Sequence, residues 1–287
     1  MKGIILAGGK GTRLYPMTTT VPKPLLPVYD KPLIYHPLSL LIKAGIKEVL
    51  VIVPPYLQEP FELLLGDGSN LGMEITYKQQ MVQRGIADAF IVGKDFIGKD
   101  DVCLMLADNI FIGTDKQLTF TPDEKMNGAM VFGYYVDNPK PFGVVEFDKD
   151  GNVISIEEKP QNPKSNYIVP GMYFYDNDVV EIAENVKPSA RGELEITSVN
   201  EEYLKRKKLK VIAIEKDVKW FDAGTPDNLL SSAFAVKEYQ EKTGKILACI
   251  EEDAFEAGFI DKNKMLEISE NLKKVDYGKY IKQVADR

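Results

Sequence analysis

Residues 3–14 read Gly-Ile-Ile-Leu-Ala-Gly-Gly-Lys-Gly-Thr-Arg-Leu, an apolar run that passes directly into a loop rich in glycine. Because Gly8, Gly9 and Gly11 carry no Cβ, their backbone N–H groups can come close to a ligand and point at phosphate oxygens. The stretch therefore predicts a β-strand followed by a phosphate-binding loop. A plain glycine turn has the same composition, so the loop alone leaves both interpretations open.

Two cations follow these glycines closely in the sequence. They are Arg13, inside the loop, and Lys23, in the segment Val-Pro-Lys-Pro-Leu at residues 21–25. Guanidinium and ammonium groups bind phosphate oxygens through charge-assisted hydrogen bonds. The two side chains are therefore the first candidates for holding a polyphosphate.

The spelling of the loop disfavours two common phosphate-binding motifs. A P-loop needs serine or threonine after its lysine, but Gly11 follows Lys10. A dinucleotide-binding fingerprint needs a third glycine where this chain has Leu14. Asp30 stands at about the distance expected of a ribose-binding acid, but it lies among prolines instead of ending a second strand. A dinucleotide-dependent oxidoreductase is therefore disfavoured.

The composition is that of an ordinary globular protein, with 44% hydrophobic and 28% charged residues. The net charge of −7 disfavours nucleic-acid binding, which depends on basic surface. The longest apolar runs are far shorter than the roughly 20 residues that span a bilayer. The N-terminus does not resemble a secretion signal. We expect a cytoplasmic protein with no membrane or nucleic-acid partner.

Cysteine and histidine are scarce in this chain. Cys103 and Cys249 have no metal-ligand spacing, and Cys103 lies in an apolar run that is expected to be core. His36, the single histidine, lies in a helical pattern and is expected to be a packing or surface residue. A mechanism built on Ser-His-Asp or on histidine-bound metal is therefore disfavoured.

Strand-like and helix-like segments alternate along the first part of the chain and predict an α/β fold with a mostly parallel sheet flanked by helices. We expect strands at 3–6, 48–53, 74–78 and 102–106, and helices at 33–44, at 59–65 and from Gly85 to about residue 92. Ligands of such sheets bind beyond the carboxyl ends of the strands. Residues 8–13 and Asp108 both fall at such ends.

The rest of the chain is first rich in strands and then helical. We expect strands at 131–136, 144–147, 153–156, 172–175 and 210–214, and helices at 194–205, 227–242 and 262–284. Some of these strands are expected to be antiparallel additions to the sheet.

The chain resembles the sugar-phosphate nucleotidyltransferases, and among them the short form of the glucose-1-phosphate thymidylyltransferases. The glycine loop and Pro-Lys-Pro-Leu-Leu-Pro carry this resemblance together with Leu64-Leu-Gly-Asp-Gly-Ser69, Asp108-Asn109, Phe142-Gly-Val-Val-Glu-Phe147, Glu157-Glu-Lys-Pro-Gln161, Lys164-Ser-Asn-Tyr167, Arg191-Gly-Glu-Leu-Glu-Ile-Thr197 and Trp220-Phe-Asp-Ala-Gly-Thr225. The resemblance implies a Rossmann-like catalytic domain at 1–240, with a nucleotide-binding part to about 128 and a sugar-binding part at about 129–225. Residues 241–287 are expected to form a helical extension at the interface of a homotetramer.

The resemblance also implies a reaction. In this family the phosphate of a hexose 1-phosphate attacks the α-phosphorus of a nucleoside triphosphate and expels pyrophosphate. Such a phosphate is already ionised, since its second pKa is about 6, so no general base is needed. The implied substrates are dTTP (or UTP) and glucose 1-phosphate, the implied cofactor is Mg²⁺, and the implied pathway is nucleotide-sugar synthesis of the dTDP-rhamnose type. The implied metal ligands are Asp108 and Asp222, and the implied catalytic cations are Arg13, Lys23 and Lys159.

The other site residues are carried over from the same resemblance. Those implied for the nucleotide are Leu6, Gly8, Gly9, Gly11, Thr12, Arg13, Lys23, Gln80, Gly85 and Asp108. Those implied for the sugar phosphate are Asn109, Gly143, Glu158, Lys159, Gly171 and Arg191. Gln80 suits a pyrimidine edge because an amide both donates and accepts, although a surface glutamine is the ordinary alternative. Arg191 could instead anchor Glu193 or Glu195.

Two departures from the thymidylyltransferase pattern leave the base preference open. Pro24 and Asp88 each stand where that pattern usually has glutamine, so an amide is lost near the base and an anion is added. Lys-Pro-Leu also occurs in related uridylyl- and cytidylyltransferases, which makes a UTP- or CTP-dependent enzyme the first alternative. A non-catalytic nucleotide-sugar sensor is the second, and it is disfavoured because binding alone would not require both metal acids.

Overall fold

The computed structural model describes residues 1–9, 11–120 and 125–287. Its strands are β1 (Lys2–Leu6), β2 (Pro27–Val28), β3 (Lys31–Pro32), β4 (Glu48–Val53), β5 (Glu74–Gln79), β6 (Val102–Leu106), β7 (Asn109–Ile112), β8 (Ala129–Tyr135), β9 (Gly143–Phe147), β10 (Val153–Glu158), β11 (Tyr167–Ile168), β12 (Met172–Tyr175), β13 (Leu209–Ala213) and β14 (Lys219–Asp222). Its α-helices are α1 (Tyr35–Lys43), α2 (Gln58–Leu65), α3 (Asp88–Val92), α4 (Lys94–Ile97), α5 (Val179–Asn185), α6 (Ile196–Lys205), α7 (Pro226–Thr243), α8 (Ile250–Glu256), α9 (Lys262–Asn271) and α10 (Asp276–Ala285). Short 3-10 turns are η1 (Thr12–Leu14), η2 (Lys23–Leu25) and η3 (Ser69–Leu71).

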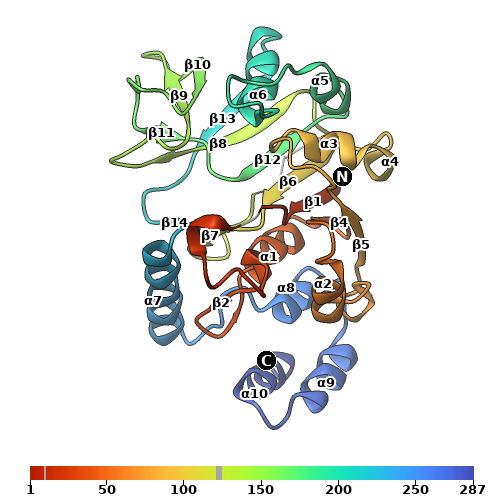
Figure 1. Cartoon of the computed structure of the whole chain (residues 1–287). Coiled ribbons are helices and arrows are strands. Elements are labelled where there is room, and N and C mark those ends of the chain that lie inside the picture. Colours follow the sequence, from red (N-terminus) through yellow and green to blue (C-terminus); the bar gives the residue numbers. More distant parts are fainter. Residues whose placement is uncertain (10, 121–124) are drawn as a thin grey trace.

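The centre of the molecule is a ten-stranded mixed sheet in the order β10-β9-β11-β8-β12-β6-β1-β4-β5, with β13 paired to β8. Strands β6, β1, β4 and β5 are parallel, whereas β12 joins β6 in antiparallel fashion and begins the other half of the sheet. Helices cover both faces (Figure 1). The predicted α/β class, with antiparallel strands added to a parallel sheet, is confirmed.

The register of two parallel strands brings the glycine loop and Asp108 together. Leu6, the last residue of β1, pairs with Leu106, the last residue of β6. Both strands run in the same direction, so the segments that follow them leave the same edge of the sheet. The loop after Leu6 and the turn that carries Asp108 therefore begin side by side.

Two apolar layers sandwich this sheet, because successive strand residues point to opposite faces. In β1, Ile5 belongs to the layer shared with α1 and the C-terminal helices, whereas Ile4 belongs to the layer shared with α3, α5 and α6. Both side chains are fully buried. A strand buried on both faces explains why the segment reads as a continuous apolar run.

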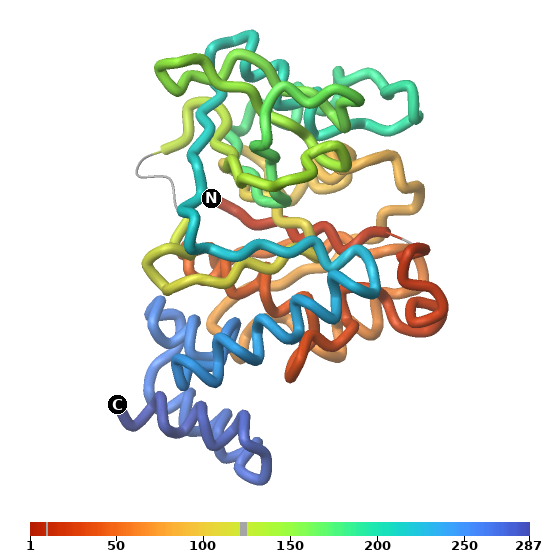
Figure 2. Tube along the Cα trace, turned by 90° about the vertical axis from the view of Figure 1, so that its left-hand side faces the viewer, coloured from red at the N-terminus to blue at the C-terminus, as the bar shows by residue number. Residues whose placement is uncertain are grey.

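The C-terminal region differs from the expected single helix at 262–284, which is wrong. The chain forms α9, turns at residues 272–275 and returns in α10 beside it (Figure 2). Gly278 allows the close approach, since a Cβ there would lie 2.2 Å from the carbonyl oxygen of Leu272. The turn lets the two helices pack against each other, with Met265 of α9 and Ile281 of α10 buried in the same apolar cluster as Leu38 of α1.

Several short elements are not predicted by the sequence pattern. They are α4, α5, α8, β7 and β14, in addition to the short pairs formed by β2, β3 and β11. Of these, β7 and β14 matter for function, because they pair in antiparallel fashion beyond the edge of the main sheet. None of the helices in the described part of the chain is long and apolar enough to cross a membrane.

Candidate active site

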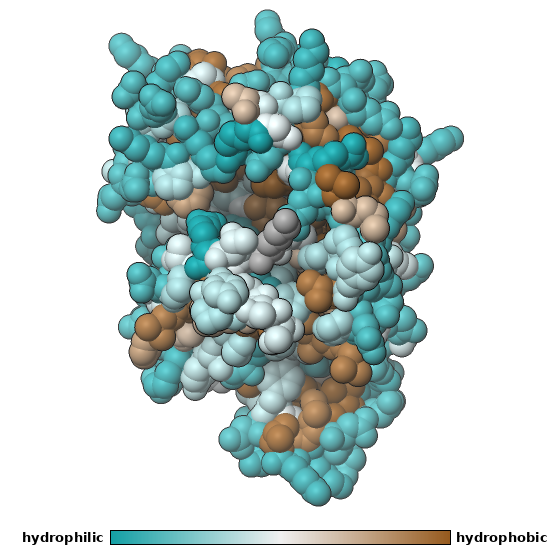
Figure 3. Space-filling view, viewed as in Figure 1, coloured by the Kyte–Doolittle hydropathy of each residue, from teal (hydrophilic) through white to brown (hydrophobic). Residues whose placement is uncertain are grey.

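A pocket of about 450 Å³ opens beyond the carboxyl ends of β1 and β6. Figure 3 shows the hollow across the middle of one face, with hydrophobic residues at its depth and hydrophilic residues around it. The residues that line it are Leu6, Gly8, Gly9, Gly11, Thr12, Arg13, Lys23, Pro24, Ile86, Leu106, Ala107, Asp108, Glu193 and Gly224. Eight of the ten residues predicted for the nucleotide are in this lining.

The glycine loop can be built only from residues without bulk at its turn into η1. Gly11 has φ of 59°, in the left-handed region, and a Cβ there would lie 2.8 Å from Cγ2 of Thr18. The hydroxyl of Thr18 in turn donates to the carbonyl oxygen of Gly11 at 2.8 Å. The loop is therefore held in a fixed shape against the wall of the pocket.

The two predicted metal acids meet because β14 pairs with β7. Asp222, the last residue of β14, is opposite Asn109, and the N–H of Ala223 donates to the backbone carbonyl of Asp108 at 3.0 Å. The two carboxylates are 114 positions apart in sequence (222 − 108), yet both lie within 3.8 Å of Lys23 Nζ; Asp108 lines the pocket, whereas Asp222 lies just outside the lining. Their separation in sequence explains why spacing alone could not bring them together.

Both predicted triphosphate cations lie against these acids. Lys23 Nζ is 2.5 Å from Asp108 Oδ2 and 3.8 Å from Asp222 Oδ1, and Arg13 Nη2 is 4.0 Å from Asp222 Oδ2. The cations therefore balance the acids in this state. The arrangement also places two positive charges where an anion that enters the pocket would meet them.

The carboxyl group of Asp222 is largely buried and only partly hydrogen-bonded. Burial, and then the charge of Asp108, raise the pKa of its carboxyl group, while Lys23 and Arg13 act against this rise. Its Oδ1 atom is buried and has no hydrogen-bond partner among the described residues. Within residues 1–9, 11–120 and 125–287, no cluster of three or more metal-ligating side chains occurs. Two carboxylates suffice for Mg²⁺, which commonly takes its other ligands from water and substrate phosphates.

Asn109 is placed behind Asp108 and not at the pocket surface. It is only 3% exposed, and its Nδ2 donates to Asp108 Oδ1 at 2.8 Å. Its Oδ1 accepts from Trp220 Nε1 at 2.6 Å and from the N–H of Gly171 at 3.1 Å. The predicted direct contact of Asn109 with sugar stays a prediction, while its observed bonds fix the position of Asp108.

Four of the six residues predicted for the sugar phosphate form a second cluster, whereas the other two, Asn109 and Gly171, lie behind Asp108. Arg191 Nη2 lies 2.8 Å from Glu195, 3.1 Å from Glu193 and 3.6 Å from Glu158, so it anchors both glutamates considered as alternatives. Lys159 Nζ is 3.6 Å from Glu158 Oε1. Gly143 adjoins the same carboxylate, since a Cβ there would lie 3.4 Å from Glu158 Oε2.

A Glu-Glu-Lys sequence at the end of a strand is usually exposed to solvent and unconstrained. Here the backbone of Lys159 and the hydroxyl of Thr197 show that the segment is held in a defined conformation. Lys159 has φ of 45°, which non-glycine residues rarely adopt. The Thr197 hydroxyl donates to Glu158, so that carboxylate is fixed from the side of α6. Glu193, which pairs with Arg191, also lines the nucleotide pocket. The two clusters are therefore adjacent.

Gln80 and Gly85, the other two predicted nucleotide residues, do not line the pocket but lie next to residues that do. Gln80 directly follows β5, and a Cβ on Gly8 would lie 2.8 Å from its Oε1. Gly85 has φ of 112°, and a Cβ there would lie 2.4 Å from the carbonyl oxygen of Leu194. Only glycine fits this contact, which joins the nucleotide wall to the segment that carries Glu193.

Some residues of the site are missed by sequence reasoning or named only within a motif. Trp220 and Thr197 belong to quoted motifs, but the sequence assigns no role to either. Arg84 belongs to no motif, although its position four residues before Asp88 is the spacing of a helical ion pair. His36 is buried in α1, which confirms the expected packing role and not the surface position, and burial lowers its pKa to about 3.

Comparison with known proteins identifies the family of this chain. The model of the nucleotidyl transferase family matches residues 2–239. A glucose-1-phosphate thymidylyltransferase from Mycolicibacterium smegmatis is 49% identical over 287 residues, which is 100% of each chain. One from Neisseria meningitidis is 49% identical over 282 residues, which is 98% of each chain.

Solved structures of related enzymes have a similar fold. A crystal structure from Bacillus anthracis, described as a putative glucose-1-phosphate thymidylyltransferase with sucrose, has a TM-score of 0.74 and 41% identity, covering 82% of this chain and 94% of that one. A UDP-glucose pyrophosphorylase with UDP-glucose shares the fold at 24% identity and a TM-score of 0.68, covering 83% of this chain and 98% of that one. This chain therefore belongs to the nucleotidyl transferase family, in the group formed by the glucose-1-phosphate thymidylyltransferases.

Proposed function

We propose that this chain transfers a thymidylyl group from dTTP to glucose 1-phosphate and releases pyrophosphate. The observation that carries the proposal is the meeting of Asp108 and Asp222 with Lys23 and Arg13 beneath a glycine loop. The adjacent cluster of Glu158, Lys159 and Arg191 supports a place for the sugar phosphate. Two anionic substrates could then be held next to one another.

The chemistry asks the protein for positioning and charge neutralisation. The phosphate of the sugar attacks the α-phosphorus of dTTP, the bond from that phosphorus to the β-phosphate oxygen breaks, and pyrophosphate leaves. The ionised phosphate needs no base, so the absence of a usable histidine is no obstacle. Arg13 is well exposed at the pocket and is free to follow the charge that develops on the leaving group.

Lys23 and Asp108 have to change partners when substrate binds. Lys23 is engaged by Asp108 at 2.5 Å in the structure, and a phosphate oxygen would replace this carboxylate. Asp108, released from Lys23, and Asp222, whose Oδ1 has no hydrogen-bond partner among the described residues, would then hold Mg²⁺. The ion would supply Lewis-acid stabilisation of phosphate oxygens. Lys159 would bind the sugar phosphate, with Glu158 accepting sugar hydroxyl groups.

The test is release of pyrophosphate from glucose 1-phosphate and each of dTTP, UTP, CTP, ATP and GTP, with Mg²⁺ added or chelated. We expect turnover with dTTP that is lost on chelation. Asp108→Asn should keep the fold and lose turnover by about 100-fold or more. Lys159→Ala should chiefly raise the KM for glucose 1-phosphate. Near wild-type rates for the first variant, or an unchanged KM for the second, would overturn these two assignments.

The same experiment separates the alternatives. Preference for UTP or CTP would assign the chain to the related enzymes that also carry Lys-Pro-Leu, with Pro24 and Asp88 as the residues to examine. Silence with all five nucleotides, together with tight binding of dTDP-glucose, would favour a nucleotide-sugar sensor.

We also propose a cytoplasmic homotetramer that serves nucleotide-sugar synthesis of the dTDP-rhamnose type. Leu230 and Phe234 support an assembly, because these two exposed apolar side chains lie one turn apart on α7. Light scattering gives the mass of the assembly directly.

A further inference from the structure

A buried pair of polar side chains lies behind the nucleotide pocket. Gln80 is 3% exposed and Asp88, the first residue of α3, is 1% exposed. Gln80 Nε2 donates to Asp88 Oδ2 at 2.8 Å. A carboxylate only accepts hydrogen bonds, whereas an amide has one end that donates and one that accepts. Asp88 therefore determines which end of the Gln80 amide it faces.

Arg84 holds this carboxylate in place from the other side. Its Nη2 lies 2.6 Å from Asp88 Oδ1, so each oxygen of Asp88 has its own donor. The guanidinium group also supplies the charge that a buried carboxylate requires. The resulting chain, Arg84 to Asp88 to Gln80, has one arrangement of donors and acceptors.

The other end of the Gln80 amide lies beside Gly8 of the glycine loop, although Gln80 itself is 3% exposed and is not among the residues that line the pocket. A Cβ built on Gly8 would lie 2.8 Å from Gln80 Oε1, so the missing side chain of Gly8 leaves this oxygen uncovered on that side. Gly8 and the apolar side chains of Leu6 and Ile86 line the pocket there. The carbonyl oxygen of Gln80, an acceptor, therefore lies directly behind the part of the wall that Gly8 forms, where no side chain separates it from the pocket.

We propose that Asp88 is a positioning residue that selects the base of the nucleotide through Gln80. Thymine and uracil carry a hydrogen on N3 and donate at that atom, whereas cytosine has a bare N3 that accepts. At that atom, a Gln80 Oε1 that faces the base accepts a hydrogen bond from the first two bases and is repelled by the lone pair of the third. The inference rests on the proposed function for the nucleotide site, and it predicts that a chain with aspartate at position 88 binds a thymine or uracil nucleotide more tightly than a cytosine nucleotide.

Asp88→Asn gives a sharp test, since only the hydrogen-bonding capacity of the side chain changes. Arg84 can only donate, so the new asparagine amide would turn its oxygen to Arg84 and its NH₂ group to Gln80. Gln80 would then reverse and present Nε2 to the pocket. We expect the ratio of affinities for dUTP and dCTP, which share sugar and phosphates and differ at this edge, to fall by about tenfold or more.

Calorimetric titration of dUTP and dCTP, without glucose 1-phosphate, measures this ratio in the absence of turnover. The ratio of kcat/KM for dTTP and CTP should fall in parallel, while the ratio for dTTP and UTP should stay constant because both bases donate at N3. Asp253→Asn is the matched control. It alters another buried acid that pairs with a cation, Lys43 at 2.7 Å, away from the pocket, and should leave all ratios unchanged.

Arg84→Met provides a second variant if Asp88→Asn does not fold, and it should narrow the dUTP to dCTP ratio less. A wild-type protein that binds dUTP and dCTP equally, or a folded Asp88→Asn variant that keeps the wild-type ratio, would overturn the inference. Selective binding of dUTP without any pyrophosphate release would instead remove the proposed reaction and leave the role of Asp88 in place.

Discussion

At the scale of residues, the position of Asp108 depends on a side chain that never needs to touch substrate. Trp220 Nε1 donates to Asn109 Oδ1, which leaves the Asn109 amide free to donate only toward Asp108. Trp220 also packs edge-on against Phe142, with ring centroids 5.3 Å apart. The tryptophan thus connects the sugar side of the site to the carboxylate proposed to bind metal.

Trp220→Phe should keep this packing and lose the hydrogen bond. We expect kcat for pyrophosphate release to fall by about tenfold, since one bond of about 1 kcal/mol orients Asp108 and a misplaced ligand costs more than the bond itself. The half-saturating Mg²⁺ concentration should rise. Tyr134→Phe is the control, because its hydroxyl accepts from the backbone N–H of Trp220 and not from the indole. Equal losses in both variants would assign Trp220 a packing role alone.

The residues that gather at the site can be predicted from motifs, but their partners cannot. Arg13, Lys23, Asp108 and Asp222 all follow from sequence motifs and lie together. The bond between Lys23 and Asp108, however, joins positions 85 residues apart, and its formation depends on how two loops pack. In sequence Asp88 is only a departure from the family pattern, whereas in the structure it is the partner of Gln80.

At the scale of elements, strands with strong apolar runs are predicted within a residue or two, since burial on both faces leaves a clear signal. The helix α8 is missed for the opposite reason. It lies in the expected helical extension, but its sequence, Ile-Glu-Glu-Asp-Ala-Phe-Glu, has no apolar face that would mark its bounds, and Glu251, Glu252 and Asp253 are buried. Their partners are Tyr277, Tyr280 and Lys43, which come from α10 and α1. Only the tertiary structure supplies them.

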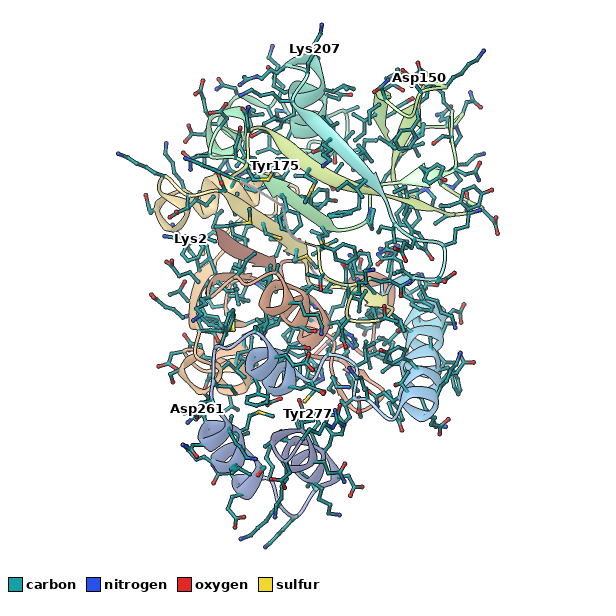
Figure 4. The ribbon with its side chains drawn as sticks, turned by 180° about the vertical axis from the view of Figure 1, so that it is seen from behind. Lys2, Asp150, Tyr175, Lys207, Asp261 and Tyr277 are labelled. Atoms are coloured by element: carbon teal, nitrogen blue, oxygen red, sulfur yellow. The ribbon has the colours of Figure 1, made fainter. Side chains whose placement is uncertain are left out.

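The hydrogen bonds to these buried acids attach α10 to the rest of the molecule, and we expect their contribution to stability to depend on pH. The Tyr277 hydroxyl, at the junction of α10 with the body of the molecule (Figure 4), donates to Glu251 at 2.5 Å. Burial raises the pKa of Glu251. Tyr277→Phe should cost about 1–3 kcal/mol of unfolding free energy at pH 8, because the buried carboxylate loses its donor.

The cost should shrink toward pH 5. Because the pKa of Glu251 is raised in the folded state, the folded state binds the proton more readily than the unfolded state. Lowering the pH from 8 toward 5 therefore favours the folded state of the variant, since protonation removes the unpaired buried charge. Urea unfolding of the variant and the wild type at both pH values measures this difference. Tyr56→Phe, at an exposed tyrosine, should have no effect at either pH. A loss for Tyr277→Phe that does not vary with pH would contradict the interpretation.

At the scale of the whole molecule, the C-terminal helices and the sheet share one apolar core. Ile5 of β1 and Leu38 of α1 belong to the same buried cluster as Ile250 of α8, Met265 of α9 and Ile281 of α10. The division into residues 1–240 and 241–287 is implied by the family resemblance. The motifs that carry this resemblance mark the active-site residues and not the limits of the hydrophobic core. Whether the extension is a separate folding unit stays a prediction, and a truncation tests it.

Removal of residues 245–287 should destabilise the rest of the chain. It uncovers apolar side chains of α1 and η3, each of which loses about 1.5–3 kcal/mol of burial. Several such losses approach the total stability of about 5–15 kcal/mol that holds a protein. We expect the fragment to aggregate or to unfold at a Tm about 10 °C lower or more. Asp286→Asn is the control, because its ion pair with Lys262 joins two exposed side chains and should contribute about 1 kcal/mol or less. A fragment that unfolds cooperatively at the Tm of the full chain would establish the extension as an independent unit.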